Sequence, residues 1–375
     1  MKLLFVFGTR PEAIKMAPVI ERARENRGFQ VQVCVTGQHR EMLDQVLRVF
    51  AIQPDFDLGV MTPGQSLSDL TVNLLRGLDE VFLRSAPNWV IVHGDTTTTF
   101  AASLAAFYRR IPVAHVEAGL RTWNLDAPWP EEANRQLTGR LARLHFAPTE
   151  QAKRNLQLEG VPDDLIHVTG NTVIDALLHV SDRIDSDAEL RQGLSDMFRF
   201  LDSSKKMVLV TGHRRENFGS AFERVCLALR DIASDPDVQI VYPVHLNPNV
   251  QRPVREVLSG LPNVFLINPV DYLPFVSLMK RSDVILTDSG GVQEEAPTLG
   301  KPVLVMRDTT ERPEGVSVGL VELVGSDRQR IVAAVRAQLS SPVLSDPSGR
   351  GRSNPFGDGR ASKRICSVLE RIRLQ

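Results

Sequence analysis

The segment 283–295 combines residue types that suit the binding of a phosphate group. An apolar run leads into Ser289, Gly290 and Gly291, and good helix formers follow, which predicts a strand, a tight turn and a helix. Glycines let backbone N–H groups approach a ligand, and a helix N-terminus attracts anions. Glu295, one helical turn later, is placed to accept hydrogen bonds from ribose hydroxyls. The pattern indicates a nucleotide-phosphate site, and a tight turn without a ligand is the alternative.

Three basic side chains and one aromatic ring add to this chemistry. Arg10 and Lys15 follow the first apolar run, where Pro11 marks a helix start. Arginine binds phosphate through two parallel hydrogen bonds, and lysine acts as a point charge. Arg312 is a further candidate cation, and Phe275 suits contact with a flat base. Solvated basic residues at a helix start are the alternative for the first two.

Three carboxylates follow predicted strands in the first half of the chain. Asp95 comes after one apolar run, Glu117 after the next, and Glu131 after a Pro-Trp-Pro segment at a helix start. Carboxylates crowded together raise one another's pKa and suit proton transfer. The alternatives are a helix N-cap for Asp95, a surface ion pair for Glu117 and an ordinary first-turn acid for Glu131.

Two histidines stand at predicted strand ends in the second half. His213 is followed by two arginines, and an imidazole there suits an acid, a base or a phosphate ligand. His245 follows another apolar run. A lone histidine is usually structural, but the strand-end position and the basic neighbours favour a functional role for His213.

Short apolar runs alternate with longer helical patterns, which is typical of parallel sheets built from βαβ units. The predicted strands are 2–7, 30–35, 89–93, 112–116 and 145–148 in the first half, and 166–169, 207–211, 239–243, 264–267, 283–287 and 302–306 in the second. Two such series predict an α/β protein with two doubly wound Rossmann-like domains facing each other across a cleft. Ligands bind beyond the carboxyl ends of strands in such domains.

The domain boundary is expected near residue 170. Residues 1–170 form the first domain, with most of the carboxylates, and 171–360 form the second, which opens on a charged helical stretch at 181–205. Residues 341–360 are rich in Ser, Pro, Gly and Asp, which predicts a linker. A last helix over 361–375 is expected to pack back on the first domain.

Composition excludes several classes of protein. The 375 residues are 42% hydrophobic and 24% charged with a net charge of −1, which gives no electrostatic case for nucleic acid or an anionic membrane. No apolar run approaches the roughly 20 residues of a membrane span. Three cysteines, far apart and with apolar neighbours, argue against disulfides and a zinc cluster and favour a cytoplasmic location.

Several cofactor motifs are missing. The chain has no G-x-G-x-x-G after a strand, no G-x-x-x-x-G-K-[ST], no H-E-x-x-H and no C-x-x-C, so a nicotinamide, a P-loop and a zinc site are disfavoured. The D-x-D pairs lie in predicted loops before strands or in the charged stretch. We therefore expect neither a cofactor nor a metal.

Eight segments occur in a fixed order along the chain. They are FGTRPEAIK (7–15), CVTGQHREMLDQ (34–45), HGDTTTT (93–99), HVEAGLRT (115–122), PWPEEANR (128–135), VTGHRREN (210–217), TDSGGVQEE (287–295) and TERPE (310–314). In these segments the chain resembles the non-hydrolysing bacterial UDP-N-acetylglucosamine 2-epimerases, from residue 2 to the last helix. The resemblance implies the two-domain GT-B fold, a homodimer, and interconversion of UDP-GlcNAc and UDP-ManNAc through UDP elimination to 2-acetamidoglucal. It also implies a supply of ManNAc for bacterial surface polysaccharide.

The resemblance also assigns residues. It implies catalytic roles for Asp95, Glu117, Glu131 and His213. It implies substrate contacts from Arg10, Lys15, Asp95, Glu117, His213, Phe275, Ser289, Gly290, Gly291, Glu295 and Arg312. An allosteric UDP-GlcNAc site is implied near Gln38, His39, Gln65, Glu131 and His245. Two positions depart from some relatives: Val270 replaces a polar residue near the base, and Gly64 replaces an arginine at the allosteric site.

Three other functions use the same nucleotide cradle. A GT-B glycosyltransferase needs an acceptor groove and does not require three carboxylates beside C2. A hydrolysing UDP-GlcNAc 2-epimerase differs in letting water capture the intermediate. A UDP-sugar sensor needs no catalytic side chains, so the presence of Asp95, Glu117, Glu131 and His213 argues against it.

Overall fold

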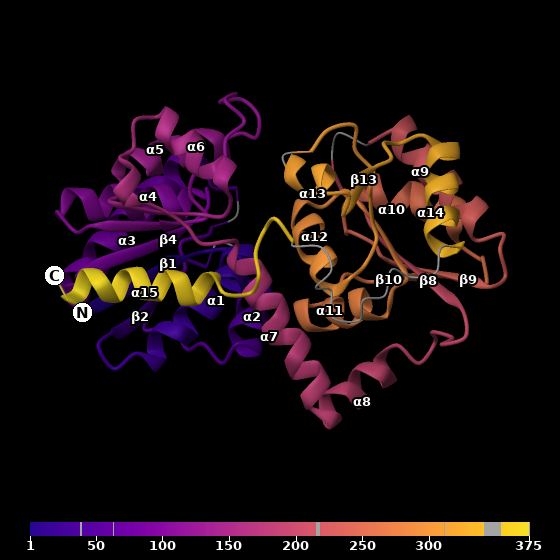
Figure 1. Ribbon diagram of the computed structural model, residues 1–375, viewed down its shortest axis with the longest axis horizontal. Helices are drawn as coiled ribbons and strands as arrows, with labels where there is room; N and C mark the ends of the chain where they lie inside the picture. The colour runs from indigo at the N-terminus through magenta and orange to yellow at the C-terminus, as the bar shows by residue number, and fades with distance from the viewer. Residues whose placement is uncertain (38–39, 63, 215–217, 311, 341–353, 375) are drawn as a thin grey trace. The chain divides into compact units, whose positions relative to one another are not determined.

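The chain folds into two compact units (Figure 1). The computed structural model describes residues 1–37, 40–62, 64–214, 218–310, 312–340 and 354–374. Unit 1 comprises Met1–Ala176 and Phe356–Gln375, and unit 2 comprises Leu177–Pro355. Helix α7 (Thr172–Ser186) begins in unit 1 and ends in unit 2. Since a continuous helix crosses the boundary, no change in composition marks it in the sequence.

Unit 1 contains a seven-stranded parallel sheet. Its strands are β1 (Lys2–Phe7), β2 (Gln30–Val35), β3 (Phe56–Asp57), β4 (Trp89–His93), β5 (Val113–Val116), β6 (Leu144–Ala147) and β7 (Ile166–Val168), in the order β3-β2-β1-β4-β5-β6-β7. In the central pairs, Phe5 lies opposite Val33 on one side and Ile91 on the other. These strands are buried apolar runs because helices cover both faces of a parallel sheet.

The helices of unit 1 form two groups. They are α1 (Arg10–Glu25), α2 (Arg40–Val49), α3 (Leu67–Ser85), α4 (Thr97–Tyr108), α5 (Glu131–Leu141), α6 (Glu150–Leu158) and α15 (Ala361–Leu374), with a 3₁₀ turn, η1, at Asp163–Leu165. α1 contacts α2 and α15, while α4 contacts α3 and α5. The C-terminal helix α15 thus packs beside α1, the first helix of the chain (Figure 1).

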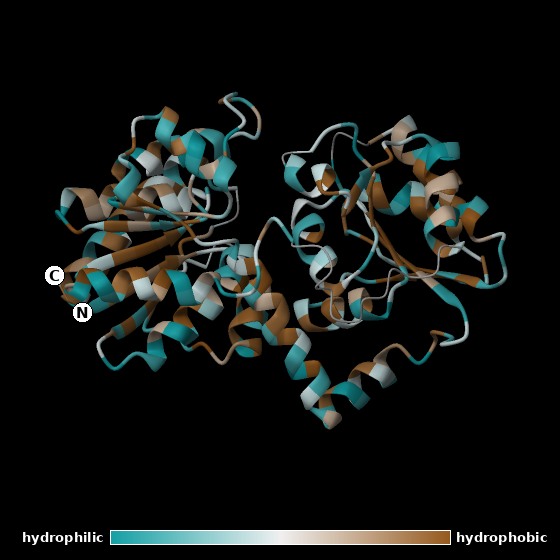
Figure 2. Ribbon diagram, in the orientation of Figure 1, coloured by the Kyte–Doolittle hydropathy of each residue, from teal (hydrophilic) through white to brown (hydrophobic). Residues whose placement is uncertain are grey.

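Unit 2 contains a six-stranded parallel sheet. Its strands are β8 (Lys206–Thr211), β9 (Val238–Pro243), β10 (Val264–Ile267), β11 (Val284–Thr287), β12 (Val303–Val305) and β13 (Val321–Leu323), in the order β10-β9-β8-β11-β12-β13. Its helices are α8 (Ala188–Met197), α9 (Ser220–Ile232), α10 (Pro248–Leu258), α11 (Tyr272–Arg281), α12 (Gly290–Glu295), α13 (Pro313–Ser317) and α14 (Arg328–Ser340), with a 3₁₀ turn, η3, at Ala296–Leu299. In both units the strands are hydrophobic and the helices carry hydrophilic stripes (Figure 2).

Each sheet reverses its direction of winding once. In unit 1 the chain adds β2 and β3 on one side of β1, then β4 to β7 on the other. In unit 2 it adds β9 and β10 beside β8, then β11 to β13 on the other side. Ligands of doubly wound sheets bind at such switch points, beyond the carboxyl ends of the strands. Ligand-binding and catalytic residues are therefore expected in the loops after β1 and β4 and in the loops after β8 and β11.

The structure confirms two doubly wound α/β units and shows where the sequence analysis differs in detail. The strand expected at 166–169 is β7, the edge strand of the unit 1 sheet. The short edge strands β3 and β13 were not predicted, because two or three residues carry too little periodic signal. Within the described residues, no helix is both long and apolar enough to cross a membrane.

Candidate active site

A buried carboxylate joins the loops after β1 and β4 in unit 1. Thr9 caps α1, and Glu12 accepts hydrogen bonds from the backbone N–H groups of Gly8 at 3.0 Å and Thr9 at 2.8 Å. The other oxygen of Glu12 accepts hydrogen bonds from the hydroxyls of Thr96 at 2.7 Å and Thr99 at 3.1 Å. Burial raises the pKa of Glu12, although these hydrogen bonds oppose the shift. The threonines after β4 therefore anchor the switch point.

Glu117 follows β5 and is surrounded by polar groups. Its carboxylate pairs with the ammonium of Lys15, accepts a hydrogen bond from Asn171 Nδ2 at 2.8 Å, and lies 3.7 Å from His93 Nε2. Its backbone has a φ of 60°, which is unusual outside glycine. Such strained conformations cluster at functional sites. Lys15, which was expected to contact a phosphate, thus pairs with the carboxylate of Glu117 in unit 1. Asn171, the second partner of Glu117, was not predicted from the sequence.

His93 is buried next to the carboxylate of Glu117. Within the described residues, neither of its ring nitrogens has a hydrogen-bond partner. Burial lowers the pKa of His93 to about 4, the charge of Lys15 adds to the shift, and the charge of Glu117 opposes it. The imidazole is therefore neutral at neutral pH.

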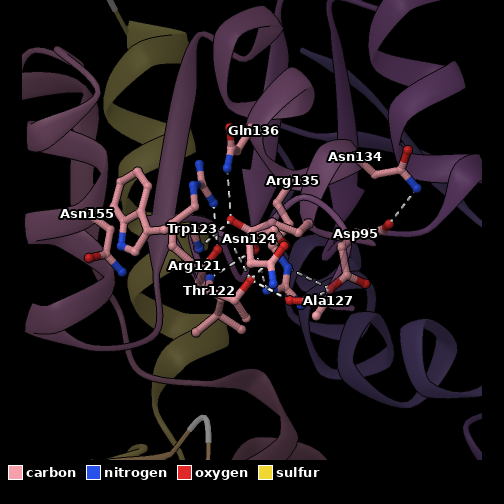
Figure 3. Close-up of polar contacts among 12 residues, drawn as sticks. Asp95, Arg121, Thr122, Trp123, Asn124, Ala127, Asn134, Arg135, Gln136 and Asn155 are labelled. Atoms are coloured by element: carbon pink, nitrogen blue, oxygen red, sulfur yellow. Dashed lines mark hydrogen bonds and ion pairs between the residues drawn. The ribbon is translucent and has the colours of Figure 1, made fainter. Parts of the chain in front are cut away.

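Asp95 follows β4 and is held by α5 (Figure 3). Its Oδ2 accepts hydrogen bonds from Arg135 Nε at 3.0 Å and from Arg135 Nη2 at 2.8 Å. Its backbone carbonyl accepts a hydrogen bond from Asn134 Nδ2 at 3.0 Å. The N-cap of α4 is Thr96, not Asp95, so the capping alternative for Asp95 is wrong.

Glu132 is the buried anchor of this arrangement. It accepts hydrogen bonds from the backbone N–H groups of Thr122 at 3.0 Å and Trp123 at 3.1 Å, from Arg135 Nη1 at 3.0 Å, and from Gln136 Nε2 at 2.9 Å. Desolvation alone raises its pKa, but Gln136, Thr122, Arg135 and Trp123 together leave the pKa of Glu132 below its ordinary value. A functional role was predicted for the preceding residue, Glu131, and not for Glu132.

Two of the three carboxylates predicted in unit 1 each have a cationic partner. Asp95 faces the guanidinium of Arg135, and Glu117 faces the ammonium of Lys15. Glu131 is half-buried at the first position of α5. Asp95 and Glu117 are therefore each part of an ion pair inside unit 1.

In unit 2 the carboxylate of Asp288 organises the loop after β8. Asp288 is fully buried at the end of β11, and its Oδ2 accepts hydrogen bonds from the backbone N–H groups of His213 at 2.9 Å and Arg214 at 2.8 Å. The Nδ1 of His213 lies 3.6 Å from Asp288 Oδ1. Asp288 belongs to the segment 287–295, but no role for it was predicted from the sequence.

His213 stacks on His245 within unit 2. Their ring centroids are 5.2 Å apart and the rings are tilted by 14°. Desolvation lowers the pKa of His213, Asp288 opposes the shift, and His245 and Arg214 add to it. His245 itself is exposed, and its Nδ1 accepts a hydrogen bond from the backbone N–H of Asn247 at 3.1 Å. The two histidines found at strand ends in the sequence are therefore neighbours.

The segment 289–291 lies against Arg312. Ser289 is at the N-cap position of α12, and a Cβ atom on Gly290 would lie 2.6 Å from Arg312 Nη1. The Nε of Arg312 donates a hydrogen bond to Glu294 Oε1 at 2.5 Å. A Cβ at position 290 would therefore displace the guanidinium from its place beside the backbone. A Cβ on Gly291 would meet Glu295 Oε2 only at 3.7 Å, an ordinary contact distance.

The remaining residues predicted for unit 2 lie on α11 and α12. The hydroxyl of Tyr272 donates a hydrogen bond to Glu295 Oε1 at 2.9 Å, and Glu295 is buried. Phe275 is half-buried in the first turn of α11. In unit 1, Arg10 is the first residue of α1 and is half-buried.

Of the predicted allosteric residues, Gln38 and His39 lie outside the described residues. Gln65, in unit 1, accepts a hydrogen bond from the backbone N–H of Thr62 at 2.9 Å. Its Nε2 is buried without a hydrogen-bond partner among the described residues. His245 belongs to unit 2.

A family model described as UDP-N-acetylglucosamine 2-epimerase matches residues 21–370. The chain belongs to the UDP-N-acetylglucosamine 2-epimerase family. It is 60% identical to the UDP-N-acetylglucosamine 2-epimerase of Yersinia pestis over 99% of this chain and 98% of that protein. It is 58% identical to the Escherichia coli K12 enzyme of the same name over the full length of both. The membership predicted from the eight segments is confirmed.

Solved structures of UDP-N-acetylglucosamine 2-epimerases share the fold. The chain is similar to the UDP-GlcNAc 2-epimerase of Neisseria meningitidis bound to UDP-GlcNAc, with a TM-score of 0.91 and 52% identity over 99% of this chain and 100% of that one. It is similar to the Methanocaldococcus jannaschii enzyme in complex with UDP-GlcNAc and UDP, with a TM-score of 0.81 and 34% identity over 99% and 100%. These relatives bind nucleotide sugars on the same fold.

Proposed function

We propose that the protein interconverts UDP-GlcNAc and UDP-ManNAc by epimerisation at C2 of the sugar. The observation that carries the proposal is the pair of cation-bound carboxylates, Glu117 with Lys15 and Asp95 with Arg135, after neighbouring strands of unit 1. Full-length identity of 58% to a UDP-N-acetylglucosamine 2-epimerase supports it.

The chemistry proposed is elimination followed by addition. The C2–H bond of the sugar is not next to a carbonyl, so direct removal of this proton faces a high barrier. When the C1–O bond breaks at the same time, its electron pair leaves with UDP, the proton passes to a carboxylate, and 2-acetamidoglucal forms. UDP then adds back to C1 while C2 receives a proton on the other face. The sum of the two steps is an isomerisation with no net redox change.

Asp95, Glu117, Glu131 and His213 are proposed as the acid–base groups. A positioned proton donor or acceptor contributes typically about 10²–10⁴-fold to a rate. Lys15 and Asn171 hold the Glu117 carboxylate through one oxygen. The ammonium favours the ionised form that accepts the C2 proton.

Unit 2 is proposed to hold UDP. Ser289, Gly290 and Gly291 offer backbone N–H groups to the phosphates, and Arg312 beside Gly290 offers its guanidinium. Glu295 accepts ribose hydroxyls and Phe275 contacts the base. We assign His213 to substrate contacts in unit 2. The resemblance assigns Arg10 to the diphosphate, where its positive charge stabilises the leaving group.

A time course of the purified protein with UDP-GlcNAc in D₂O, followed by NMR, tests the reaction. Deuterium should appear at C2 of UDP-ManNAc, because the proton on the new face comes from an exchangeable enzyme group. An ¹⁸O label in the glycosidic position should scramble within the β-phosphoryl group when UDP leaves and returns. Retention of the original C2 hydrogen without scrambling would refute the elimination mechanism.

The same experiment separates the rival functions. A hydrolysing enzyme releases UDP and free ManNAc, which give separate signals. A glycosyltransferase leaves UDP-GlcNAc unchanged until an acceptor is present. A sensor binds the nucleotide sugar without turnover.

Regulation by UDP-GlcNAc is a further part of the proposal. The resemblance implies a second nucleotide-sugar site near Gln38, His39, Gln65 and His245. The amide nitrogen of Gln65 has no hydrogen-bond partner among the described residues and can donate to a ligand oxygen. UDP-ManNAc alone should then react slowly until traces of UDP-GlcNAc are added. Full-speed conversion without a lag would refute activation, and Gly64 in place of an arginine gives a reason for that outcome.

The biological setting is proposed from the resemblance. We propose a homodimer that supplies ManNAc units for bacterial surface polysaccharide. Three buried cysteines, Cys34, Cys226 and Cys366, are free thiols. Free thiols suit a reducing compartment, which supports the cytoplasm as the site of action.

A further inference from the structure

Arg135 connects two carboxylates of very different exposure. The side chain of Asp95 is 27% exposed, that of Arg135 is 14% exposed, and that of Glu132 is fully buried. Two nitrogens of the guanidinium donate to Asp95 (Figure 3). The third donates to Glu132. The guanidinium therefore bridges the interior of unit 1 and the partly open carboxylate after β4.

The buried end of this bridge is rigid. Glu132 accepts four hydrogen bonds, and two of its donors are backbone N–H groups, those of Thr122 and Trp123. A buried carboxylate with this number of donors has a fixed orientation. Because Arg135 Nη1 is one of the four donors, the plane of the guanidinium is fixed as well.

The open end of the bridge uses only one oxygen of Asp95. Nε and Nη2 of Arg135 both donate to Oδ2, at 3.0 and 2.8 Å. Asn134, one residue earlier on α5, holds the backbone carbonyl of Asp95 at 3.0 Å. The backbone and one carboxylate oxygen are thus fixed by the same helix, and Oδ1 is the oxygen that Arg135 leaves available for proton exchange.

From this geometry we infer that Arg135 is a positioning residue for the epimerisation, which holds Oδ2 of Asp95 and directs its Oδ1 toward the sugar. The inference rests on the proposed function, because it requires Asp95 to exchange a proton with the substrate. It gives a role to Arg135, a residue of the segment 128–135 to which the resemblance assigned none. A displacement of about 1 Å at a reacting group can cost 10²-fold in rate, so the loss of this support should be measurable.

The test compares three variants in the NMR assay. Arg135→Ala should lower kcat about 10²-fold and leave KM nearly unchanged, because the lost interaction acts in the transition state. Guanidinium chloride at sub-denaturing concentration should restore part of the rate by filling the vacated space, and sodium chloride at equal ionic strength should not. Arg140→Ala removes an exposed arginine from the last turn of the same helix and should behave as the wild type.

Arg135→Lys keeps the charge but has one nitrogen, which cannot reach both Asp95 and Glu132 in the same way. Its kcat should fall roughly ten-fold, and its UDP affinity by calorimetry should stay unchanged. This variant carries the test if Arg135→Ala does not fold.

The outcomes are distinct. If folded Arg135→Ala and Arg135→Lys have the kcat of the wild type, the role of Arg135 is overturned. It is also overturned if guanidinium does not restore kcat in Arg135→Ala. In both cases the proposed function stands. No UDP-ManNAc from the wild-type protein refutes the proposed function, and the inference fails with it.

Discussion

Thr96 Oγ1 donates a hydrogen bond to Glu12 Oε1 at 2.7 Å, and this contact joins the first helix of the chain to the start of α4. The two residues follow β1 and β4, the strands on either side of the switch point in unit 1. A buried carboxylate with hydroxyl and amide donors fixes both loops in one geometry. Arg10 and Asp95 lie next to these anchors in the chain, so the stability of this contact and the geometry of the site are linked.

Glu12→Gln should destabilise unit 1. The glutamine amide group replaces one oxygen by a donor, which leaves buried N–H or O–H groups without an acceptor, at a cost of about 1–3 kcal/mol. Denaturation followed by tryptophan fluorescence reports on unit 1 alone, because Trp89, Trp123 and Trp129 all lie in it. Glu25→Gln, which changes an exposed glutamate on the same helix, is the control and should shift the unfolding free energy by less than about 1 kcal/mol. Equal effects of both changes would contradict the anchoring role.

Glu117→Gln should abolish epimerisation and preserve UDP binding. The amide has nearly the size of the carboxylate but cannot accept the C2 proton, so a loss of about 10²–10⁴-fold or more is expected. Asp95→Asn should behave in the same way. Rates come from the NMR assay and UDP affinity from calorimetry, with Glu150→Gln, an exposed glutamate of unit 1, as the control. Substantial turnover by both site variants would remove these carboxylates from the reaction.

Arg312→Ala should weaken UDP binding roughly ten-fold or more, since each charge-assisted hydrogen bond contributes about 1.5–3 kcal/mol. Gly290→Ala should have a similar effect without removing the charge, because the new Cβ would lie 2.6 Å from Arg312 Nη1 and displace the guanidinium. Gly193→Ala, on α8, adds a Cβ with no atom within 4 Å and should leave UDP affinity unchanged. Unchanged UDP affinity in both Arg312→Ala and Gly290→Ala would exclude Arg312 from the nucleotide site.

Arg10→Ala should also weaken UDP binding by roughly ten-fold or more if its guanidinium contacts the diphosphate. Calorimetry of this variant, compared with Arg22→Ala on an exposed position of the same helix, measures the effect. Identical affinities for the two variants would refute the assignment of Arg10.

The stability of unit 1 should fall as the pH drops from about 6.5 toward 4. Burial lowers the pKa of His93 to about 4; the charge of Glu117 opposes this shift and the charge of Lys15 adds to it. A histidine in the unfolded chain has a pKa of about 6.5. Protons therefore bind the unfolded chain first, and each such histidine lowers stability by about 1.4 kcal/mol per pH unit across this range. His115 and His145, with pKa values lowered by burial to about 3 and about 4, add to the slope.

His93→Phe tests the contribution of His93 to this slope. Phenylalanine fills the buried position and orphans no hydrogen bond within the described residues, since the ring nitrogens of His93 have no partner there. The variant should lose about one histidine's share of the pH dependence in tryptophan-monitored denaturation. Parallel stability curves for wild type and variant would show that His93 does not titrate in this way.

The fold class and the positions of most candidate residues could be predicted from the order of amino acids. Apolar runs set the strands of both sheets, because a parallel sheet covered on both faces must bury each strand. Asp95, Glu117, His213 and Ser289 could be placed at strand ends from that pattern alone. The family followed from segments such as 93–99 and 287–295, since their residues occur in the same order along the chain.

Which groups contact one another depends on how the chain folds in three dimensions. Arg135 lies 40 residues from Asp95 in the chain, and Asn171 lies 54 residues from Glu117. Periodicity describes how a segment buries one face, but it carries no information on which distant side chain meets it. The buried carboxylates of Glu12, Glu132 and Asp288 escaped the sequence analysis for this reason, because their roles come from the donors that the fold places around them.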